Sequence, residues 1–393
     1  MKPSPRQWTL VALAAVLAAG AVGLLARSKR QAPRTRYDCL IIRSLTGRDN
    51  VVTSRGFPAY YPPDASSGKE RSVVPAASRE AQLLGTHVRV TVYDTDDERA
   101  RVAVDAALER IAELSAKLNI FDPASAVSRL NQEAHRAPMA IDDDLARLIA
   151  QSQRVARLSG GAFDATVGPL TALWREYRRA GRLPPLEEVK QRTERVDYRL
   201  VELGAPPTVR FAREGMSFDF GGIAKGFAAD EAAEVLTRHG VRSAIIDCGG
   251  DLKLVGSRPG GEPFRVGVDE PNPDAASPLR FLLHLSDTSV VTSGNYRQFT
   301  MIAGRRCSHI IDPRTGESIE ALPSVTVIGP NSTLCDALAT AISVLGEEDG
   351  LELIQRVNAA PAEVQAASWG QFSADVLREC CLGRASTSSP SMR

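Results

Sequence analysis

The hydrophobic period of the chain changes from two residues to that of a helix within residues 86–119. In residues 86–92, Val88, Val90 and Val92 alternate with polar residues, which is the two-residue period of a half-buried strand. Residues 96–119 then carry apolar residues at helical spacing. This segment therefore predicts a strand that is followed closely by a long helix.

Both kinds of element recur further along the chain. Residues 142–161 predict a helix that ends at a glycine pair, and residues 230–240 predict a helix that stops at Gly240. Residues 243–256 and 324–329 predict strands. With 43% hydrophobic residues in a chain of 393, a substantial core can form in one large domain or two ordinary ones.

An uncharged run at residues 9–26 marks a targeting segment. The run is at the short end of membrane-spanning length, so residues 1–30 are predicted to be either a signal peptide or a membrane anchor. The small residues 19–21 resemble a cleavage site. However, more basic residues follow the run than precede it, which argues against export. Charge alone therefore leaves the topology open.

The remaining chain divides by composition. Residues 31–79 are rich in Pro, Ser and Arg without a sustained apolar period, and we expect a tether there. The folded domain is placed at residues 80–382, and residues 383–393 are expected to be a disordered tail.

Charge and cysteine usage exclude two kinds of site. The net charge is +1 and no basic stripe with interleaved aromatic residues is apparent, so nucleic-acid binding is not expected. The six cysteines show no CxxC pair and no Cys/His spacing suited to zinc. We expect most of them to be small buried residues.

The stretch "CDALATAISVLG", residues 335–346, carries two oxygen side chains in an otherwise apolar helix. Asp336 and Thr340 are four residues apart, so both lie on one helix face and can point at the same spot. The alternative is that Asp336 caps the helix and Thr340 is a tolerated filler.

The stretch "FDFGGIAKGFAADEAAEVL" predicts a strand, a glycine turn and a helix. The glycines let backbone approach a ligand closely, and the helix N-terminus offers N–H groups to a phosphate. The carbonyl of Ala224 is a candidate ligand for a hard cation if the turn leaves it unpaired. The alternative is a tight turn in which Lys225 is solvated.

Three further segments carry candidates for ligand contact. Phe163 and Asp164 lie beside small residues that can hold a planar ring, although a core phenylalanine and a capping aspartate would also fit. Phe121 is a candidate stacking platform. His309 lies where a predicted strand meets the tight turn "DPRTG", and it is either a catalytic or a structural histidine.

Taken in order, eight motifs resemble those of the ApbE-type FAD:protein FMN transferases: "LGT", "FDPxSxxSRLN", "GGAFDxTVGPL", "GGIAKGFAAD", "GGDLKLVG", "TSGNYR", "SHIIDPRTG" and "SVTV…DALAT". They run from about residue 80 to about residue 355. The resemblance implies a single α+β catalytic domain of the ApbE-like, T-fold-related type, with mixed sheets and flanking helices. It also implies that FMN from FAD is joined by a phosphoester to Ser or Thr of an acceptor redox protein, and that AMP is released.

The resemblance also implies a set of site residues. The metal, usually Mg²⁺, would be held by Asp336, Thr340 and the carbonyl of Ala224. Such oxygen ligands suit magnesium better than zinc. The implied flavin-site residues are Leu84, Phe121, Ala162, Phe163, Asp164, Gly221, Lys225, Phe227 and the main chain of Ile310.

Two of the implied residues receive chemical roles as hypotheses. His309 would act as general base or proton relay for the acceptor hydroxyl, which is a weak nucleophile. Lys225 would stabilise charge on the pyrophosphate, with a structural salt bridge as the alternative.

The chain departs from the family pattern at four positions. Leu84 replaces a methionine. Phe121 replaces a tyrosine, and this second change keeps the aromatic stacking face but loses the hydroxyl. Asn295 replaces an aspartate, and Cys335 replaces an alanine. None of these changes removes an implied metal ligand or the histidine.

Two other functions stay open from the sequence. A Mg²⁺-dependent FAD pyrophosphatase would use water in place of the acceptor hydroxyl at the same site. A flavin-binding protein would hold FAD without turnover, although the presence of Asp336, Thr340 and His309 argues against it. By family habit, we expect an enzyme associated with the inner membrane, with its catalytic domain in the periplasm.

Overall fold

The computed structural model describes residues 40–43, 50–51, 75–94, 96–269, 279–294, 299–302, 304–319 and 324–359. These residues all belong to one unit, Tyr37–Arg393. The predicted targeting segment, the predicted tail and Asn295 lie outside the described residues. Within the described ranges, no helix is both long enough and apolar enough to cross a membrane.

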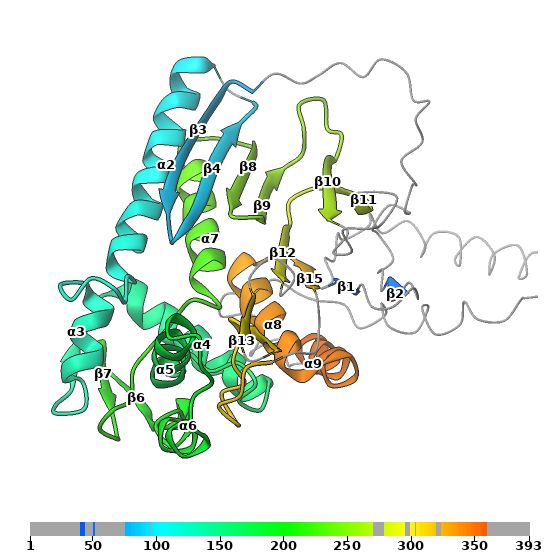
Figure 1. Ribbon diagram of the computed structural model, residues 1–393. Coiled ribbons are helices and arrows are strands. Elements are labelled where there is room, and N and C mark those ends of the chain that lie inside the picture. Colours follow the sequence, from blue (N-terminus) through cyan, green and yellow to red (C-terminus); the bar gives the residue numbers. More distant parts are fainter. Residues whose placement is uncertain are drawn as a thin grey trace, which may run out of the picture. The chain divides into compact units, whose positions relative to one another are not determined.

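An eight-stranded sheet forms the centre of this unit (Figure 1). Its strands follow the order β2-β1-β15-β12-β9-β8-β4-β3, and every neighbouring pair is antiparallel. The expectation of mixed sheets is therefore wrong for the named strands. The strands are β1 Leu40–Arg43, β2 Asn50–Val51, β3 Ala77–Leu83, β4 Thr86–Val92, β8 Ser243–Cys248, β9 Asp251–Gly256, β12 Ser289–Gly294 and β15 Ser324–Gly329.

The strand predicted from the two-residue period is confirmed as β4. Val88, Val90 and Val92 are fully buried, and β4 pairs with β8 from Val88↔Cys248 onward. At the other side of the sheet, β1 pairs with β15 in the register Leu40↔Ile328. The range predicted to be a tether therefore contributes a strand to the sheet.

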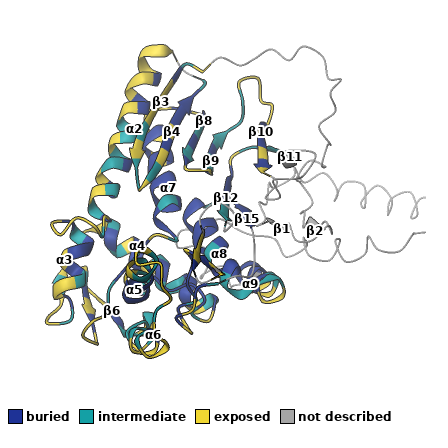
Figure 2. Ribbon diagram, viewed as in Figure 1, coloured by how far each residue is buried: buried dark blue, intermediate teal, exposed yellow. Residues whose placement is uncertain are grey.

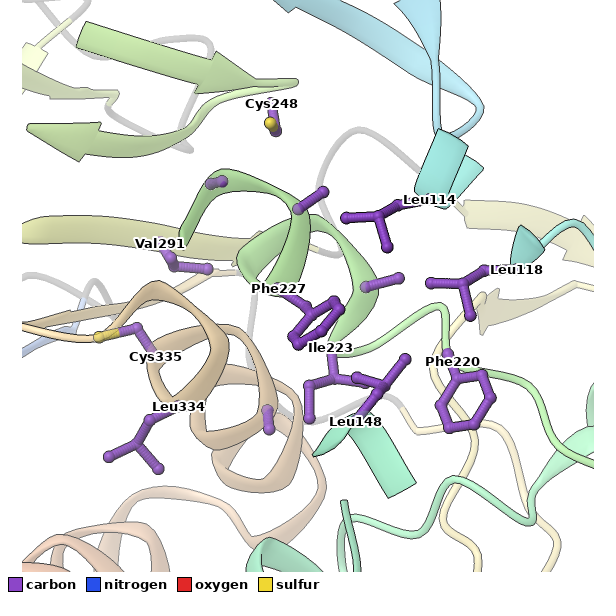
Figure 3. Close-up of a cluster of buried hydrophobic side chains, with 14 of the residues drawn as sticks. Leu114, Leu118, Leu148, Phe220, Ile223, Phe227, Cys248, Val291, Leu334 and Cys335 are labelled. Atoms are coloured by element: carbon purple, nitrogen blue, oxygen red, sulfur yellow. The ribbon is translucent and has the colours of Figure 1, made fainter. Parts of the chain in front are cut away.

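Three long helices cover the sheet: α2 Asp97–Lys117, α7 Ala224–Arg238 and α8 Ser332–Leu345. Helix α2 contacts β3 and β4, α7 contacts β8 and β9, and α8 contacts β12 and β15. Helix α7 is buried along most of its length, whereas α2 keeps one side exposed (Figure 2). The core lies where α7 and α8 meet, around Ile223, Phe227 and Leu334 (Figure 3).

The described residues form further helices and strands. The helices are α3 Ala126–Glu133, α4 Asp143–Leu158, α5 Gly168–Arg179, α6 Leu186–Thr193, η1 Tyr198–Leu200 and α9 Glu347–Ala359. One small sheet has the order β5-β7-β6, with β5 Met139–Ala140, β6 Val201–Gly204 and β7 Thr208–Phe211. Two hairpins are formed by β10 Phe264–Asp269 with β11 Leu279–Leu285, and by β13 Phe299–Ile302 with β14 Arg305–Ser308.

The strand expected before the glycine turn is absent. Phe218 instead exchanges two hydrogen bonds with the Asn131 side chain, which donates to the Phe218 carbonyl at 2.9 Å and accepts from its N–H at 2.7 Å. A side-chain amide thus satisfies backbone groups that a neighbouring strand would otherwise pair. The rings of Phe211, Phe218 and Phe220 pack in series beside this contact.

Candidate functional site

A cavity of about 730 Å³ is lined by the glycine turn, α5, α7, α8, β10, β12 and the segment after β14. It brings together most of the residues predicted from the sequence. Those that line it are Leu84, Ala162, Phe163, Asp164, Gly221, Lys225, His309, Ile310, Asp336 and Thr340. These residues come from five separate parts of the chain, so only the fold assembles them.

Two glycines allow the glycine turn and α7 to approach α8. A Cβ atom at Gly226 would lie 2.2 Å from the carbonyl oxygen of Ser332, and one at Gly222 would lie 2.9 Å from Thr340 Oγ1. The sequence predicted close backbone approach to a ligand here. In the structure, the neighbour that excludes larger side chains is helix α8.

Asp336 and Thr340 occupy the face of α8 that meets the glycine turn. The Asp336 carboxylate is 2% exposed, and its Oδ2 accepts from the Gly226 N–H at 3.0 Å. Thr340 Oγ1 lies 3.4 Å from the Gly222 carbonyl oxygen. Asn331 caps α8, accepting from the Leu334 N–H, so the alternative that Asp336 is the helix cap is wrong.

Asp251 is a buried carboxylate that the sequence reasoning missed. It begins β9, is 1% exposed, forms an ion pair with Lys225 and accepts from the Thr292 N–H at 3.2 Å. Lys225 Nζ also lies 3.9 Å from Asp336 Oδ1. The motif "GGDLKLVG" contains Asp251, but periodicity alone cannot show that a carboxylate at the start of a strand points inward.

Asp251, Asp336 and Lys225 form an acidic cluster, in which two carboxylates share one ammonium group. This sharing affects the pKa of Asp251 and that of Lys225. Burial raises the pKa of Asp251, and the neighbouring Asp336 raises it further, while Lys225 opposes both. Burial alone would lower the pKa of Lys225, but Asp336 and Asp251 raise it. Lys225 is therefore held as a cation between two acidic groups.

The donor atoms of this cluster fit a hard divalent cation. The Asp336 carboxylate, the Thr340 hydroxyl and the Gly222 carbonyl line the cavity and offer oxygen only. The carboxylates of Asp336 and the buried Asp251 outnumber the single ammonium group of Lys225, so negative charge is in excess. Within the described ranges, no group of three or more His, Cys, Asp or Glu could hold a metal ion. Substrate oxygens and waters would therefore complete the coordination. Ala224 begins α7 and does not line the cavity, so its role as a ligand stays a prediction.

The flavin-site segment around Phe163 and Asp164 is buried and tightly braced. Asp164 Oδ1 accepts from the Thr166 N–H and hydroxyl, both at 2.8 Å, and Oδ2 accepts from the Tyr198 N–H at 2.8 Å. Burial raises the pKa of Asp164, and these donors oppose the rise. Asp164 therefore lines the cavity and also holds the backbone at Thr166 and Tyr198 in place.

His309 and Ile310 follow β14 and line the cavity. The His309 side chain is exposed, whereas Ile310 is buried. The Ile310 N–H donates to Ser308 Oγ at 3.0 Å, and its carbonyl accepts from the Ile319 N–H at 3.1 Å. These bonds fix the backbone next to His309 but engage the main-chain groups that the resemblance assigned to FAD.

Two predicted flavin-site residues do not line the cavity. The Phe227 ring is 2% exposed and packs in the core (Figure 3). The Arg147 guanidinium lies 5.5 Å from its centroid. Phe121 is 67% exposed, and the Arg175 guanidinium lies 4.6 Å from its ring centroid. Helical spacing along α7 directs the Phe227 ring inward, and the assignments of Phe227 and Phe121 as flavin contacts stay predictions.

Helix α5 adds a wall that the sequence reasoning did not identify. Thr171, Arg175 and Arg178 line the cavity from this helix, together with Asp219. Asp219 accepts from the Thr171 hydroxyl at 2.8 Å and from the Gly221 N–H at 3.0 Å. It thereby joins α5 to the glycine turn. The spacing of Arg175 and Arg178 at i and i+3 was the available signal.

Comparison with known proteins identifies close likenesses over the folded unit. A model of the ApbE family matches residues 84–364. A FAD:protein FMN transferase of Treponema pallidum is 36% identical over 304 residues, covering 72% of this chain and 83% of that protein. The FAD:protein FMN transferase of Haemophilus influenzae is 29% identical over 308 residues, covering 75% of this chain and 87% of that protein.

Solved structures show the same likeness. The ApbE protein of Thermotoga maritima matches with a TM-score of 0.64 at 30% identity, covering 70% of this chain and 89% of that chain. The flavinyl transferase ApbE of Pseudomonas stutzeri, in its apo form, matches with a TM-score of 0.63 at 28% identity, covering 72% of this chain and 88% of that chain.

Proposed function

Since this chain belongs to the ApbE family, we propose that it is an FAD:protein FMN transferase. It cleaves FAD, joins FMN through a phosphoester to a Ser or Thr of an acceptor redox protein, and releases AMP. The observation that carries the proposal is that Asp336 and Lys225 line one cavity with His309. Asp251, buried behind the cavity wall, completes the acidic cluster by pairing with Lys225.

The charge of the cluster supports a role for Mg²⁺. The pyrophosphate of FAD would be repelled by Asp336 and Asp251 unless a divalent cation lay between them. Asp336 and Thr340 would hold this cation, with a main-chain carbonyl of the glycine turn or Ala224. When bound, Mg²⁺ would neutralise the charge that develops on the phosphoryl oxygens.

The protein side chains supply the remaining steps. Lys225, held by two carboxylates at one end of α7, stabilises negative charge on the phosphates. His309 takes the proton from the acceptor hydroxyl, which then attacks the phosphorus of the FMN half. The P–O bond to the AMP half breaks, and AMP leaves with the electron pair. The exposed His309 side chain suits contact with a second protein.

The test is the intact mass of a candidate acceptor domain with an exposed Ser or Thr. It is incubated with the full chain, FAD and Mg²⁺, with EDTA as the control, and AMP is measured in parallel. We expect the acceptor to gain one FMN only in the presence of Mg²⁺. An unmodified acceptor with free FMN and AMP would instead identify a pyrophosphatase. Bound FAD with no AMP would identify a binding protein.

We also propose that residues 1–30 attach the enzyme to the inner membrane with the catalytic domain in the periplasm. The uncharged run at residues 9–26 supports attachment, whereas the basic residues after it oppose export. Protease added to intact spheroplasts should degrade the catalytic domain without lysis. Protection until lysis would contradict the periplasmic placement.

A further inference from the structure

The α5 wall of the cavity, formed by Thr171, Arg175 and Arg178, carries one arginine that has no acidic partner among the described residues. Arg178 lines the cavity and its side chain is about half-buried. No hydrogen bond or ion pair joins the Arg178 guanidinium to any residue that the structure describes, and its Nε is buried without a partner. Half-buried charges are normally paired, so an unpaired guanidinium in a cavity wall calls for an anion.

The surroundings of Arg178 hold it in place. Its guanidinium lies 6.0 Å from the ring centroid of Trp174, which is itself buried and donates to the Gly316 carbonyl at 2.8 Å. A guanidinium beside an aromatic ring keeps its N–H edge available for a ligand. Burial lowers the pKa of Arg178, the Cys307 thiol opposes that lowering, and the charge of Arg175 adds to it.

Arg175 differs from Arg178 because it has partners. Its guanidinium lies over Phe121 and 3.7 Å from Asp219 Oδ2. The two arginines lie one helical turn apart on α5, and both face the cavity. The positive charge of this wall therefore centres on Arg178, whereas the acidic cluster lies on α7, α8 and β9.

We propose that Arg178, supported by Arg175, forms an oxyanion-binding subsite on the α5 wall, separate from the acidic cluster. The inference rests on the proposed function, because the anion belongs to one of its two substrates. A phosphate of FAD and a carboxylate of the acceptor segment offer the same chemistry to a guanidinium, which binds both through paired N–H groups.

The experiment compares three variants of the full chain with the wild type. Arg178→Met removes the charge at similar volume, and Arg178→Lys keeps the charge but loses the planar fork. Arg179→Met is the matched control, because Arg179 is exposed on the same helix and does not line the cavity. FAD and riboflavin, which has no phosphate, are titrated in EDTA. The FMN transfer rate is then measured against acceptor concentration with Mg²⁺.

Two results support the subsite and identify the source of its anion. If FAD supplies the anion, Arg178→Met weakens FAD binding by at least about tenfold and leaves riboflavin binding unchanged. If the acceptor supplies it, FAD binding stays unchanged and the KM for the acceptor rises by at least about tenfold. Arg178→Lys is intermediate and Arg179→Met matches the wild type in either case.

Thermal unfolding separates a binding role from a structural one. Removing an unpaired, half-buried charge should leave Tm unchanged or higher in Arg178→Met. A lowered Tm with equal losses of FAD and riboflavin binding would overturn the proposal. So would FAD affinity and acceptor KM that both stay within twofold of the wild type. Failure of the proposed function is distinct, since the wild type itself would then transfer no FMN.

Discussion

Asp336 shows how one side chain serves both the fold and the site. Its Oδ2 accepts from the Gly226 N–H, which fastens the start of α7 to α8, and its Oδ1 lies near Lys225. The same carboxylate faces the cavity. A substitution that keeps the hydrogen-bond acceptor but removes the charge can separate the two roles.

Asp336→Asn is expected to reduce AMP release by about a hundredfold or more, because the cation would lose its charged ligand. Tm should change little, since the Asn oxygen can still accept from Gly226. AMP release is measured over a range of Mg²⁺ concentrations, with the exposed Asp143→Asn on α4 as the control. Full activity at limiting Mg²⁺ would show that the metal assignment is wrong.

His309→Ala is expected to lower FMN transfer by about 10²–10⁴-fold, which is the range for loss of a general base. FAD binding should be largely kept, because the Ile310 backbone beside it is fixed by Ser308 and Ile319. Single-turnover transfer and FAD titration measure the two effects. His239→Ala, at the exposed end of α7, is the control. An unchanged transfer rate would remove His309 from the mechanism.

The packing of helix α7 against α8 determines whether the site forms. The glycine at position 226 lets the first turn of α7 touch the Ser332 carbonyl, and the Asp336 side chain then reaches the Gly226 N–H. The expected helix over residues 230–240 is confirmed, but α7 begins earlier, at Ala224. The sequence pattern missed this first turn because it contains a glycine and few periodic residues.

Gly226→Ala is expected to destabilise the protein by about 3 kcal/mol, because the added Cβ would overlap a backbone oxygen that cannot move alone. Activity should fall as well, since Asp336 and Lys225 shift with the helices. Urea unfolding followed by circular dichroism gives the free energy of unfolding. Glu234→Ala, at an exposed position of α7, should stay within about 0.5 kcal/mol of the wild type. An equally small effect at Gly226 would contradict this packing.

Across the whole molecule, an ion cluster connects three helices. Arg110 of α2 donates to Asp144 of α4 at 2.5 Å and to Glu231 of α7 at 2.6 Å. Arg147 bonds the same two carboxylates at 2.9 and 2.7 Å. Burial alone would raise the pKa of Asp144, but hydrogen bonds from Arg110 and Lys117 lower it well below its usual range.

Asp144→Asn is expected to lower the free energy of unfolding by about 2 kcal/mol at pH 7. Because the folded-state pKa of Asp144 is lowered, its contribution is complete above the ordinary aspartate pKa of about 4. The contribution disappears as the pH falls towards the folded-state value. Urea titrations at pH 7 and at about pH 3 test this. If Asp144→Asn lowers the free energy of unfolding by the same amount at both pH values, the pairing of Asp144 with Arg110 and Lys117 does not stabilise the fold.

Local sequence patterns were enough to predict most of the elements and the shared helix face of Asp336 and Thr340. The strand at Val88, Val90 and Val92 and the helices that follow were predictable because burial on one face imposes a period of two or 3.6 residues. The shared face of Asp336 and Thr340 followed from helix geometry in the same way. Hydrophobic period and helix geometry are local properties, so they can be read from the sequence without knowledge of the fold.

Which residues meet depends on the three-dimensional fold. Asp251 joins Lys225 because β9 and α7 are neighbours, Phe227 turns into the core, and Arg178 faces the cavity without a partner. The strand expected at Phe218 was replaced by contact with the Asn131 side chain. Each of these outcomes depends on burial and pairing between segments far apart in the chain, which no local period records.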